Sequence, residues 1–440
     1  MNIILLSGGS GKRLWPLSND IRSKQFIKFF KNSDGTYESM VQKVYKQIKK
    51  ADKNALITIA TSKQQVSSIR NQLGSDVSIC VEPCRKDTFP AVVLSALFLK
   101  DELKIDLNEP VIVCPVDPYV DDEYFESLKD LSDLVKNSKS NLCLLGVTPT
   151  YPSEKYGYIV PTTNDKVSCV SSFKEKPSKE MAKKLIEKGA LWNGGIFGFI
   201  LGYLINKSIE NFNCSFYKDL LSQYNNLPKI SFDYAIVEKE CNIQVMRYNG
   251  RWADLGTWNT LTEAIDDKII GKGITDVSST GVHIINELDL PILAMGLHDV
   301  IISASPDGIL VSDKEHSSYI KKYVENLGAQ VRYAEKSWGS FTVIDVDRGY
   351  LTMKVTLLPG HKMNYHSHKH RDEVWVVLSG TGKTIIEGIE NTIRSGDTIF
   401  IKSGQKHTVI ATTELKMIEI QLGKDIKFED KEKFDLTLCE

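Results

Sequence analysis

The chain begins with a short apolar run that leads directly into a glycine-rich, basic loop. Residues 2–6 are Asn-Ile-Ile-Leu-Leu, and residues 7–11 are Ser-Gly-Gly-Ser-Gly. This pattern predicts a buried β-strand that ends in a tight turn. Glycines in such a turn let backbone N–H groups approach a phosphate, and Lys12, Arg13 and Lys24 add positive charge nearby. We therefore expect a phosphorylated ligand, in the first place a nucleotide, at this loop.

Two common phosphate-binding motifs do not fit this loop. Leu6 stands where a P-loop needs its first glycine, and Arg13 stands where it needs Ser or Thr. Leu14 occupies the place of the third glycine of the dinucleotide-binding fingerprint. The loop is therefore expected to belong to another class of phosphate site, and an ordinary strand and turn without a ligand is the alternative.

Size and composition restrict the classes of protein that the chain can represent. With 440 residues it is long enough for more than one domain. Its formal net charge of −1 gives no basic field for nucleic acid, and no apolar run approaches the ~20 residues of a membrane span. Eight cysteines at irregular spacing lack a CxxC pair, so neither a zinc ribbon nor a disulfide framework is expected. Without a signal-peptide pattern, these features predict a cytoplasmic protein with reduced thiols and no nucleic-acid or membrane partner.

The order of apolar runs predicts three parts. Residues 1–265 alternate short apolar runs with amphipathic stretches, which predicts a doubly wound, Rossmann-like α/β domain with a mainly parallel sheet. Residues 266–330 indicate a small connecting β unit with one helix over residues 317–327. Residues 331–440 contain many short β-rich runs separated by turns, which predicts a β-barrel or jelly roll, the class to which cupins belong.

Residues 8–18, Gly-Gly-Ser-Gly-Lys-Arg-Leu-Trp-Pro-Leu-Ser, and residues 24–26, Lys-Gln-Phe, form a longer signature. It resembles the GGxGxRLxPLS and KQF pattern of the sugar-1-phosphate nucleotidylyltransferases, most of all the bacterial mannose-1-phosphate guanylyltransferases. The resemblance implies that Arg13 and Lys24 are catalytic and bind phosphates, with Lys24 stabilising the departing pyrophosphate. It implies a nucleotide-binding set of Ser7, Gly8, Gly9, Gly11, Lys12, Arg13, Glu82, Arg85 and Thr88.

Two aspartates are candidates for a magnesium site, because nucleotidyl transfer needs a divalent cation and Mg²⁺ uses one or two carboxylates. Asp117 ends an apolar run in Pro-Val-Asp-Pro, where the family has Pro-x-Asp-His, so Pro118 is a departure. Asp254 lies in Trp-Ala-Asp-Leu-Gly-Thr-Trp, which resembles the family's Trp-x-Asp-Leu-Gly-Ser-Trp. The resemblance implies that both are catalytic Mg²⁺ ligands, and a turn or helix-cap role is the alternative for each.

Phe-Lys-Glu-Lys-Pro at residues 173–177 matches the family's sugar-phosphate motif. The resemblance implies that Glu175 contacts the sugar and Lys176 its phosphate, and that Gly157, Asn193 and Asp233 complete this site. A carboxylate accepts hydrogen bonds from sugar hydroxyls and an ammonium attracts phosphate, which suits both roles. A solvated charged turn is the alternative.

The loop expected to contact the base departs from the family pattern. Asp87 and Phe89 replace the usual Asn and Ala after Arg85. Base selection depends on a few hydrogen bonds, so the sequence leaves the base and the sugar open. GTP with mannose 1-phosphate is the expected pair, and CTP or heptose 1-phosphate is the alternative.

Histidine spacing in the last part predicts a metal site. We expect strand alternation to place His366, His368 and His370 on one face. Imidazoles with one carboxylate suit a divalent transition metal such as Zn²⁺. In the second motif Lys402 replaces a proline. The two-part cupin pattern is met by Gly360, His366, His368, Glu373, Gly380, Gly396, Gly404 and His407, with His366, His368, Glu373 and His407 as the ligands.

The same stretch resembles the isomerase half of bifunctional mannose-6-phosphate isomerase/mannose-1-phosphate guanylyltransferases. The motif His-Lys-His-Arg-Asp-Glu-Val-Trp at residues 368–375 carries the likeness. It implies that His370 and Arg371 serve isomerisation, with Arg371 holding the substrate phosphate. A non-catalytic, structural cupin and a nucleotide-binding sensor without turnover stay open as alternatives. The expected assembly is a homo-oligomer, in the first place a dimer.

Overall fold

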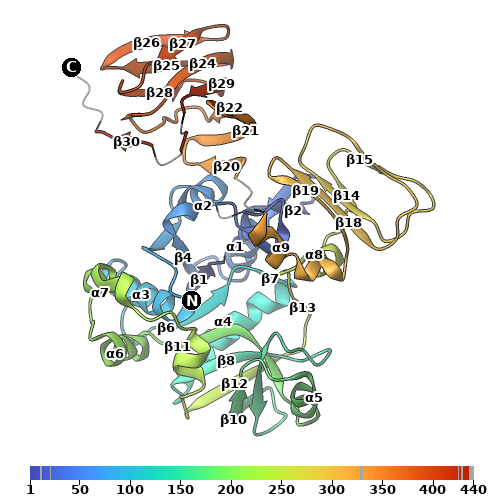
Figure 1. Cartoon of the computed structure of the whole chain (residues 1–440). Coiled ribbons are helices and arrows are strands. Elements are labelled where there is room, and N and C mark those ends of the chain that lie inside the picture. Colours follow the sequence, from blue (N-terminus) through green and yellow to red (C-terminus); the bar gives the residue numbers. More distant parts are fainter. Residues whose placement is uncertain (10–11, 20, 328–330, 425, 428–429, 436–440) are drawn as a thin grey trace. The chain divides into compact units, whose positions relative to one another are not determined.

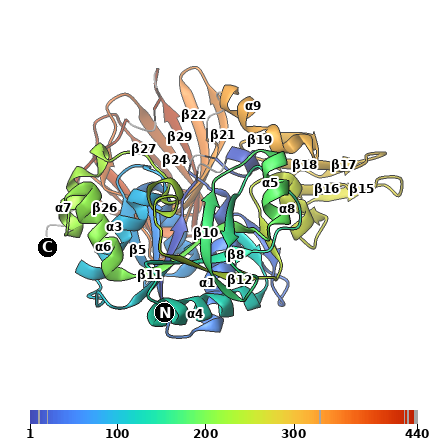
Figure 2. The same ribbon diagram turned by 90° about the horizontal axis from the view of Figure 1, so that it is seen from below.

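The computed structural model describes residues 1–9, 12–19, 21–327, 331–424, 426–427 and 430–435. The chain forms two compact units. The first consists of Met1–Ser10 and Gln25–Asp266, and the second consists of Gly11–Lys24 and Asp267–Glu440. Figures 1 and 2 show the elements of both units from two directions.

A nine-stranded sheet forms the centre of the first unit (Figure 1). In spatial order its strands are β5 (Ser78–Glu82), β4 (Leu56–Ser62), β1 (Asn2–Ser7), β6 (Pro110–Pro115), β11 (Leu191–Ile200), β8 (Leu142–Val147), β12 (Ile243–Tyr248), β10 (Val167–Lys174) and β9 (Gly157–Pro161). β1 pairs in parallel with β4 and β6, whereas β11 runs antiparallel to β6, β8 and β9. The predicted α/β class is confirmed, but the sheet is mixed rather than mainly parallel, because β9, β10 and β11 pair with their neighbours antiparallel. β1 and β6 end at the same edge, which brings the glycine loop and Asp117 to one end of the sheet.

Two groups of helices pack on this sheet (Figure 2). α1 (Met40–Ala51) contacts α4 (Asp122–Asn137), and α3 (Thr88–Asp101) contacts α6 (Leu201–Phe212) and α7 (Tyr217–Gln223). α1 begins at a capping box, in which the Ser39 side chain accepts from the Gln42 N–H and Gln42 accepts from the Ser39 N–H. α3 is buried along almost its whole length because its sequence is apolar on every face. Further elements of this unit include α2 (Val66–Leu73), α5 (Lys179–Glu187), α8 (Trp258–Ala264), β2 (Lys28–Lys31) and β3 (Tyr37–Ser39).

The second unit contains a small β structure that follows the first unit in the chain. One sheet has the order β14 (Ile269–Ile270), β16 (His283–Asn286), β18 (Val300–Ser305) and β19 (Gly308–Asp313), and a parallel pair joins β15 (Gly273–Thr275) to β17 (Ile292–Ala294). Val282, Ile284, Ala294 and Ile302 form its apolar core. The helix predicted over residues 317–327 is a 3₁₀ turn at His316–Tyr319 followed by α9 (Lys321–Asn326).

Residues 12–24, which carry part of the N-terminal signature, pack with this β structure within the second unit. Arg22 donates from both terminal nitrogens to the Glu287 carboxylate at 2.7 and 2.8 Å. Asn19 Nδ2 donates to Asp307 Oδ2 at 2.6 Å, and Ser305 Oγ donates to the Pro16 carbonyl at 2.7 Å. The connecting β unit therefore holds the segment that contains Lys12 and Arg13.

Two sheets form the C-terminal barrel, as predicted. One has the order β20 (Tyr333–Lys336), β21 (Gly339–Asp347), β22 (Tyr350–Leu357), β29 (Leu415–Leu422), β24 (Asp372–Ser379) and β27 (Thr398–Ile401). The other has the order β26 (Ile389–Arg394), β25 (Thr381–Ile386), β28 (His407–Ala411), β23 (His366–Ser367) and β30 (Glu432–Lys433). Alternate residues of β22, β24 and β29 are buried, with Trp375 completely enclosed.

Two predictions about the chain as a whole can be compared with this fold. Among the described residues, no helix is both long and apolar enough to span a membrane. The seven described cysteines are all free thiols.

Candidate functional site

A cavity of about 450 Å³ opens in the first unit. It joins side chains from segments that are far apart in sequence. Eight predicted site residues line it, namely Thr88, Asp117, Gly157, Glu175, Lys176, Asn193, Asp233 and Asp254. The structure therefore gathers the candidate metal ligands and the whole candidate sugar-phosphate set in one place.

Short strands bring the two candidate metal ligands together. β7 (Pro118–Val120) pairs antiparallel with β13 (Trp252–Asp254), and Asp254 lies opposite Pro118. Asp117 directly precedes Pro118, so both carboxylates stand at the same end of this pair, and both are half-buried in the cavity wall. Two carboxylates with open approach to one cavity suit Mg²⁺, which keeps further coordination positions for phosphate and water.

The candidate sugar-phosphate residues form a compact polar group. Lys176 Nζ lies 2.9 Å from Glu175 Oε1, and Asn193 Nδ2 donates to Asp233 Oδ1 at 2.6 Å. Among the described residues, the buried Glu175 Oε2 has no hydrogen-bond partner, so it is available to accept from a ligand hydroxyl. Trp252 Nε1 is likewise a buried donor without a described partner in the cavity wall. A polyhydroxylated, phosphorylated ligand would satisfy these groups.

Asp233 provides a test of the electrostatics of this cavity. Burial, and next the charge of Glu175, raise its pKa from 3.8 to about 6. The native carboxyl thus binds a proton more tightly than the unfolded chain, and the free energy of unfolding falls as the pH rises from about 4 to about 6. We expect Asp233→Asn to stabilise the chain by up to about 3 kcal/mol at pH 7 and to have little effect near pH 3.8.

Thermal denaturation at the two pH values measures this difference. Asp165→Asn is the matched control, because Asp165 is exposed and should leave the transition unchanged. If Asp233→Asn changed the melting temperature equally at both pH values, the carboxylate charge would not be the cause of the stabilisation.

The residues of the predicted nucleotide loop are divided between the units. Ser7 ends β1 and is buried, and Gly9 has a φ of +111°, which favours glycine at that position. Gly11 lies outside the described residues. Lys12 and Arg13 form a 3₁₀ turn in the second unit, and Lys24 ends the same segment. Their roles toward a nucleotide stay predictions.

The candidate base-recognition loop follows β5. Glu82 is buried, and its Oε2 accepts from Tyr224 Oη at 2.8 Å. Burial raises the pKa of this carboxyl, and the hydrogen bond from Tyr224 opposes the shift. Arg85 follows Glu82 on the loop and is exposed, and Thr88 Oγ1 accepts from the Phe232 N–H at 2.8 Å. Tyr224 therefore fixes the orientation of Glu82, a role that sequence reasoning missed because Tyr224 belongs to no motif.

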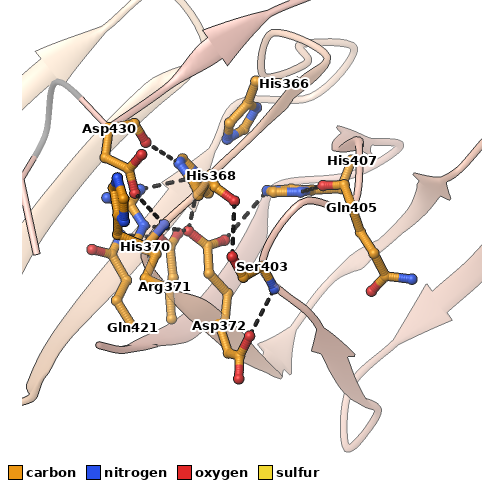
Figure 3. A network of polar contacts seen from close by, with 12 residues as sticks. His366, His368, His370, Arg371, Asp372, Ser403, Gln405, His407, Gln421 and Asp430 are labelled. Atoms are coloured by element: carbon orange, nitrogen blue, oxygen red, sulfur yellow. Dashed lines mark hydrogen bonds and ion pairs between the residues drawn. The ribbon is translucent and has the colours of Figure 1, made fainter. Parts of the chain in front are cut away.

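Three buried histidines meet inside the C-terminal barrel (Figure 3). One ring nitrogen each of His366, His368 and His407 lies within 4.8 Å of the others. Nδ1 of His366 donates to the Asn364 carbonyl at 2.6 Å, and Nδ1 of His407 donates to the Gln405 carbonyl at 2.9 Å. Nδ1 of His368 donates to the Asp430 carbonyl. Burial, followed by the charge of Lys431, lowers the pKa of His366 to about 2, so this ring is neutral. Neutral imidazoles that are oriented through Nδ1 and present Nε2 fit a transition-metal site.

Glu373 stands beside this triad as the predicted fourth ligand. Its Oε1 lies 3.0 Å from His368 Nε2, and its Oε2 lies 3.4 Å from His407 Nε2. Burial alone would raise its pKa, but the adjacent His368 and His407 hold the pKa well below its ordinary range. Trp375 Nε1 donates to Oε2 at 3.1 Å, and Arg371 Nε donates to Oε1 at 3.0 Å. The carboxylate is thus ionised and firmly oriented.

The expectation that His370 shares a face with His366 and His368 is wrong. β23 ends at Ser367, and His370 is exposed in a bend. The Asp430 carboxylate accepts from the backbone N–H groups of Lys369 and His370, which holds the bend and interrupts the alternation of the strand (Figure 3).

A further polar pair in the barrel was not predicted from sequence. Glu419 and Gln421 on β29 are buried on the inner face, and Gln421 Nε2 donates to Glu419 Oε1 at 2.6 Å. Burial and the nearby charge of Glu373 raise the pKa of Glu419 to about 7. The alternation Met-Ile-Glu-Ile-Gln at residues 417–421 contained the signal, because it places polar residues at inward positions.

Comparisons with known proteins agree with this arrangement. A family model described as nucleotidyl transferase matches residues 2–269, and one described as mannose-6-phosphate isomerase C-terminal matches residues 325–436. A mannose-1-phosphate guanylyltransferase of Salmonella muenchen is 30% identical and covers 97% of this chain and 96% of its own. A putative mannose-1-phosphate guanylyltransferase of Vibrio cholerae is 28% identical over 98% of this chain and 99% of its own. A crystal structure from Thermus thermophilus, titled mannose-1-phosphate geranyltransferase, has 26% identity and a TM-score of 0.62 over 74% of this chain and 98% of its own.

Proposed function

The chain belongs to the nucleotidyl transferase family, and from this premise we propose that it transfers a guanylyl group from GTP to mannose 1-phosphate. The products are GDP-mannose and pyrophosphate. The observation that supports this most is the cavity in which Asp117 and Asp254 face the polar group of Glu175, Lys176 and Asp233. A metal-binding carboxylate pair next to a sugar-phosphate site is what in-line transfer requires.

Each side chain of the cavity has a defined task in this proposal. Asp117 and Asp254 hold Mg²⁺, which when bound neutralises phosphate charge and orients the phosphate groups of both substrates. Glu175 Oε2 accepts from a sugar hydroxyl, and Lys176 binds the phosphate of the sugar phosphate. Gly157 gives the sugar room, because a Cβ at this residue would lie 2.4 Å from Glu175 Oε2.

The nucleotide is assigned to the glycine loop and the base loop. Backbone N–H groups of Gly8 and Gly9 bind phosphates, and the charges of Lys12, Arg13 and Lys24 are assigned to the same ligand. Glu82, held by Tyr224, accepts from donors on the base, and guanine presents such donors on its pairing edge. This orientation of Glu82 favours guanine over a base without neighbouring donors.

The barrel supplies a second proposed activity, the interconversion of fructose 6-phosphate and mannose 6-phosphate. His366, His368, Glu373 and His407 hold a divalent transition metal such as Zn²⁺, which polarises the carbonyl and hydroxyl oxygens of the substrate when bound. We assign the proton transfer between the two carbons to Glu419, because it is buried on the inner face of β29 near Glu373, and its raised pKa of about 7 suits both steps. We also infer a homodimer in the cytoplasm as the working form.

A matrix of four nucleoside triphosphates against several hexose 1-phosphates tests the transferase assignment. With Mg²⁺ present, we expect pyrophosphate release to be at least about tenfold faster for GTP with mannose 1-phosphate than for any other pair, the factor that one lost polar contact causes. Preference for CTP or for a heptose 1-phosphate would retain the reaction and contradict the substrate. Nucleotide binding without pyrophosphate release for any pair would favour a sensor.

A further inference from the structure

The C-terminal segment of the described chain lies along the histidine-bearing sheet of the barrel. β30 pairs antiparallel with β23, with Lys433 opposite His366 and Glu432 opposite Ser367. The Phe434 N–H donates to the Tyr365 carbonyl at 2.9 Å. Asp430 binds the bend after β23 through its carboxylate, as Figure 3 shows, and binds His368 through its carbonyl. The segment is therefore an integral edge of the metal site.

This pairing determines which side chains of the segment face the histidines. Opposite residues of an antiparallel pair point to the same side of the sheet, so Lys433 shares the side of His366. Lys431, two residues earlier, follows on that side, and Glu432 points to the other side, where its carboxylate lies 3.6 Å from Lys369 Nζ. Two ammonium groups are thus brought to the inner side of the barrel.

The two lysines differ in depth. Lys433 is exposed at the edge, whereas Lys431 is half-buried and close enough to Glu419, Glu373 and Arg371 for their charges to act on it. Burial lowers the pKa of Lys431 to about 8, with the two carboxylates opposing the shift, so the amine still carries its proton at neutral pH. Neither lysine has a side-chain hydrogen bond or an ion pair within 4 Å in the described part of the chain. A half-buried ammonium near the histidine triad without a counter-charge within 4 Å is suited to bind an anion.

Arg371, the residue that the sequence suggested for the phosphate, is already engaged by the protein. It is 6% exposed, and it donates from Nε to Glu373 and from Nη1 to the Lys427 carbonyl at 2.9 Å. Its Nη2 lies 3.1 Å from His368 Nε2. These contacts make Arg371 a positioning residue for the Glu373 carboxylate, and another cation is needed for a substrate phosphate.

We propose that Lys431, assisted by Lys433, binds the phosphate group of the sugar 6-phosphate in the barrel. The proposal rests on the isomerase function proposed above and deepens it by assigning the anion site to the C-terminal segment. A dianionic phosphate gains a charge-assisted hydrogen bond from Lys431 and longer-range attraction from Lys433. Removing the inner ammonium should weaken binding of the substrate and leave the metal in place.

Isomerase kinetics of Lys431→Met, Lys433→Met and Lys431→Arg test this assignment. We expect Lys431→Met to raise KM for fructose 6-phosphate and the inhibition constant of inorganic phosphate about 10- to 100-fold, the range for a hydrogen bond to a charged group. The rise should be smaller for Lys433→Met, and Lys431→Arg should recover most of the affinity. In each variant, the metal bound per chain and the rate of pyrophosphate release should equal those of the parent chain. A variant that only disturbs the structure of the barrel would not retain both.

Lys383→Met is the matched control, because Lys383 is on the same barrel in an exposed pair with Glu390 at 2.7 Å. An active parent whose KM and phosphate inhibition are unchanged by both Met substitutions would overturn the lysine assignment and leave the isomerase intact. A parent chain that carries metal but interconverts no sugar 6-phosphate would instead overturn the isomerase itself.

Discussion

Replacing Asp254 by Asn should lower pyrophosphate release about 1,000-fold while leaving isomerisation in the barrel at the parental rate. The amide keeps the size of the side chain but removes the negative charge that holds a divalent cation. Loss of several kcal/mol of charge stabilisation in the transition state corresponds to this factor, since about 1.4 kcal/mol changes a rate tenfold. Steady-state pyrophosphate release at saturating substrates and a range of Mg²⁺ concentrations measures the effect.

Asp117, the second candidate ligand of the same ion, allows a stricter test of this prediction. Asp117→Asn should have a similar effect, and the double variant should be little worse than either single one, because both carboxylates serve the same ion. Asp133→Asn is the control, since Asp133 is exposed on α4 and away from the cavity lining. Parental rates in Asp254→Asn, or fully additive losses in the double variant, would contradict a shared metal site.

Short-range sequence patterns predicted those strands and helix ends whose conformation depends on neighbouring residues in the chain. The apolar run before the glycine loop is β1, and Ser39 with Gln42 forms the capping box at the start of α1. The direction of β11 was beyond such reasoning, because an apolar run of strand length reads equally well in a parallel or an antiparallel sheet. Its direction follows from the route of the chain, which only tertiary structure reveals.

In the candidate sites, sequence motifs identified some residues, whereas other residues near them were found only from the structure. Asp117 and Asp254 were found from motifs, and the pairing of β7 with β13 brings them into one cavity. Lys431, Glu419 and Tyr224 belong to no motif, and only the fold brings the first two near Glu373 and places Tyr224 against Glu82. The exposed position of His370 depends on Asp430, a residue that no spacing rule connects with the histidine motif.

The position of the N-terminal signature could not be predicted for a similar reason. The chain segment with Lys12 and Arg13 is held in the second unit by the ion pair of Arg22 with Glu287. Arg22 is 8% exposed, and burying its guanidinium without such a partner would be costly. Burial and the adjacent Glu287 carboxylate act in opposite directions on its pKa, which is raised overall. Part of the transferase signature therefore depends on the connecting β unit for its conformation.

Replacing His407 by Ala should remove the barrel metal and lower isomerisation about 1,000-fold, while pyrophosphate release stays at the parental rate. His407 is 1% exposed, its Nδ1 is fixed by the Gln405 carbonyl, and its Nε2 faces His366, His368 and Glu373 (Figure 3). Loss of one of few ligands reduces metal affinity strongly, and a metal that polarises the substrate oxygens contributes several kcal/mol to the rate. Metal content per chain after dialysis, measured by mass spectrometry, should fall from about one to background.

Thermal stability gives a second measure of the same change. A metal that binds only the folded barrel stabilises it, so a chelator should lower the melting temperature of the parent chain and have no effect on His407→Ala. His361→Ala is the control, because its imidazole is exposed and its Nδ1 contacts only the Pro359 carbonyl among described partners. Full metal content in His407→Ala would contradict the triad. Parental isomerisation by a metal-free variant would instead show that the barrel reaction needs no metal, because the proton transfer would then depend on side chains such as Glu419 alone.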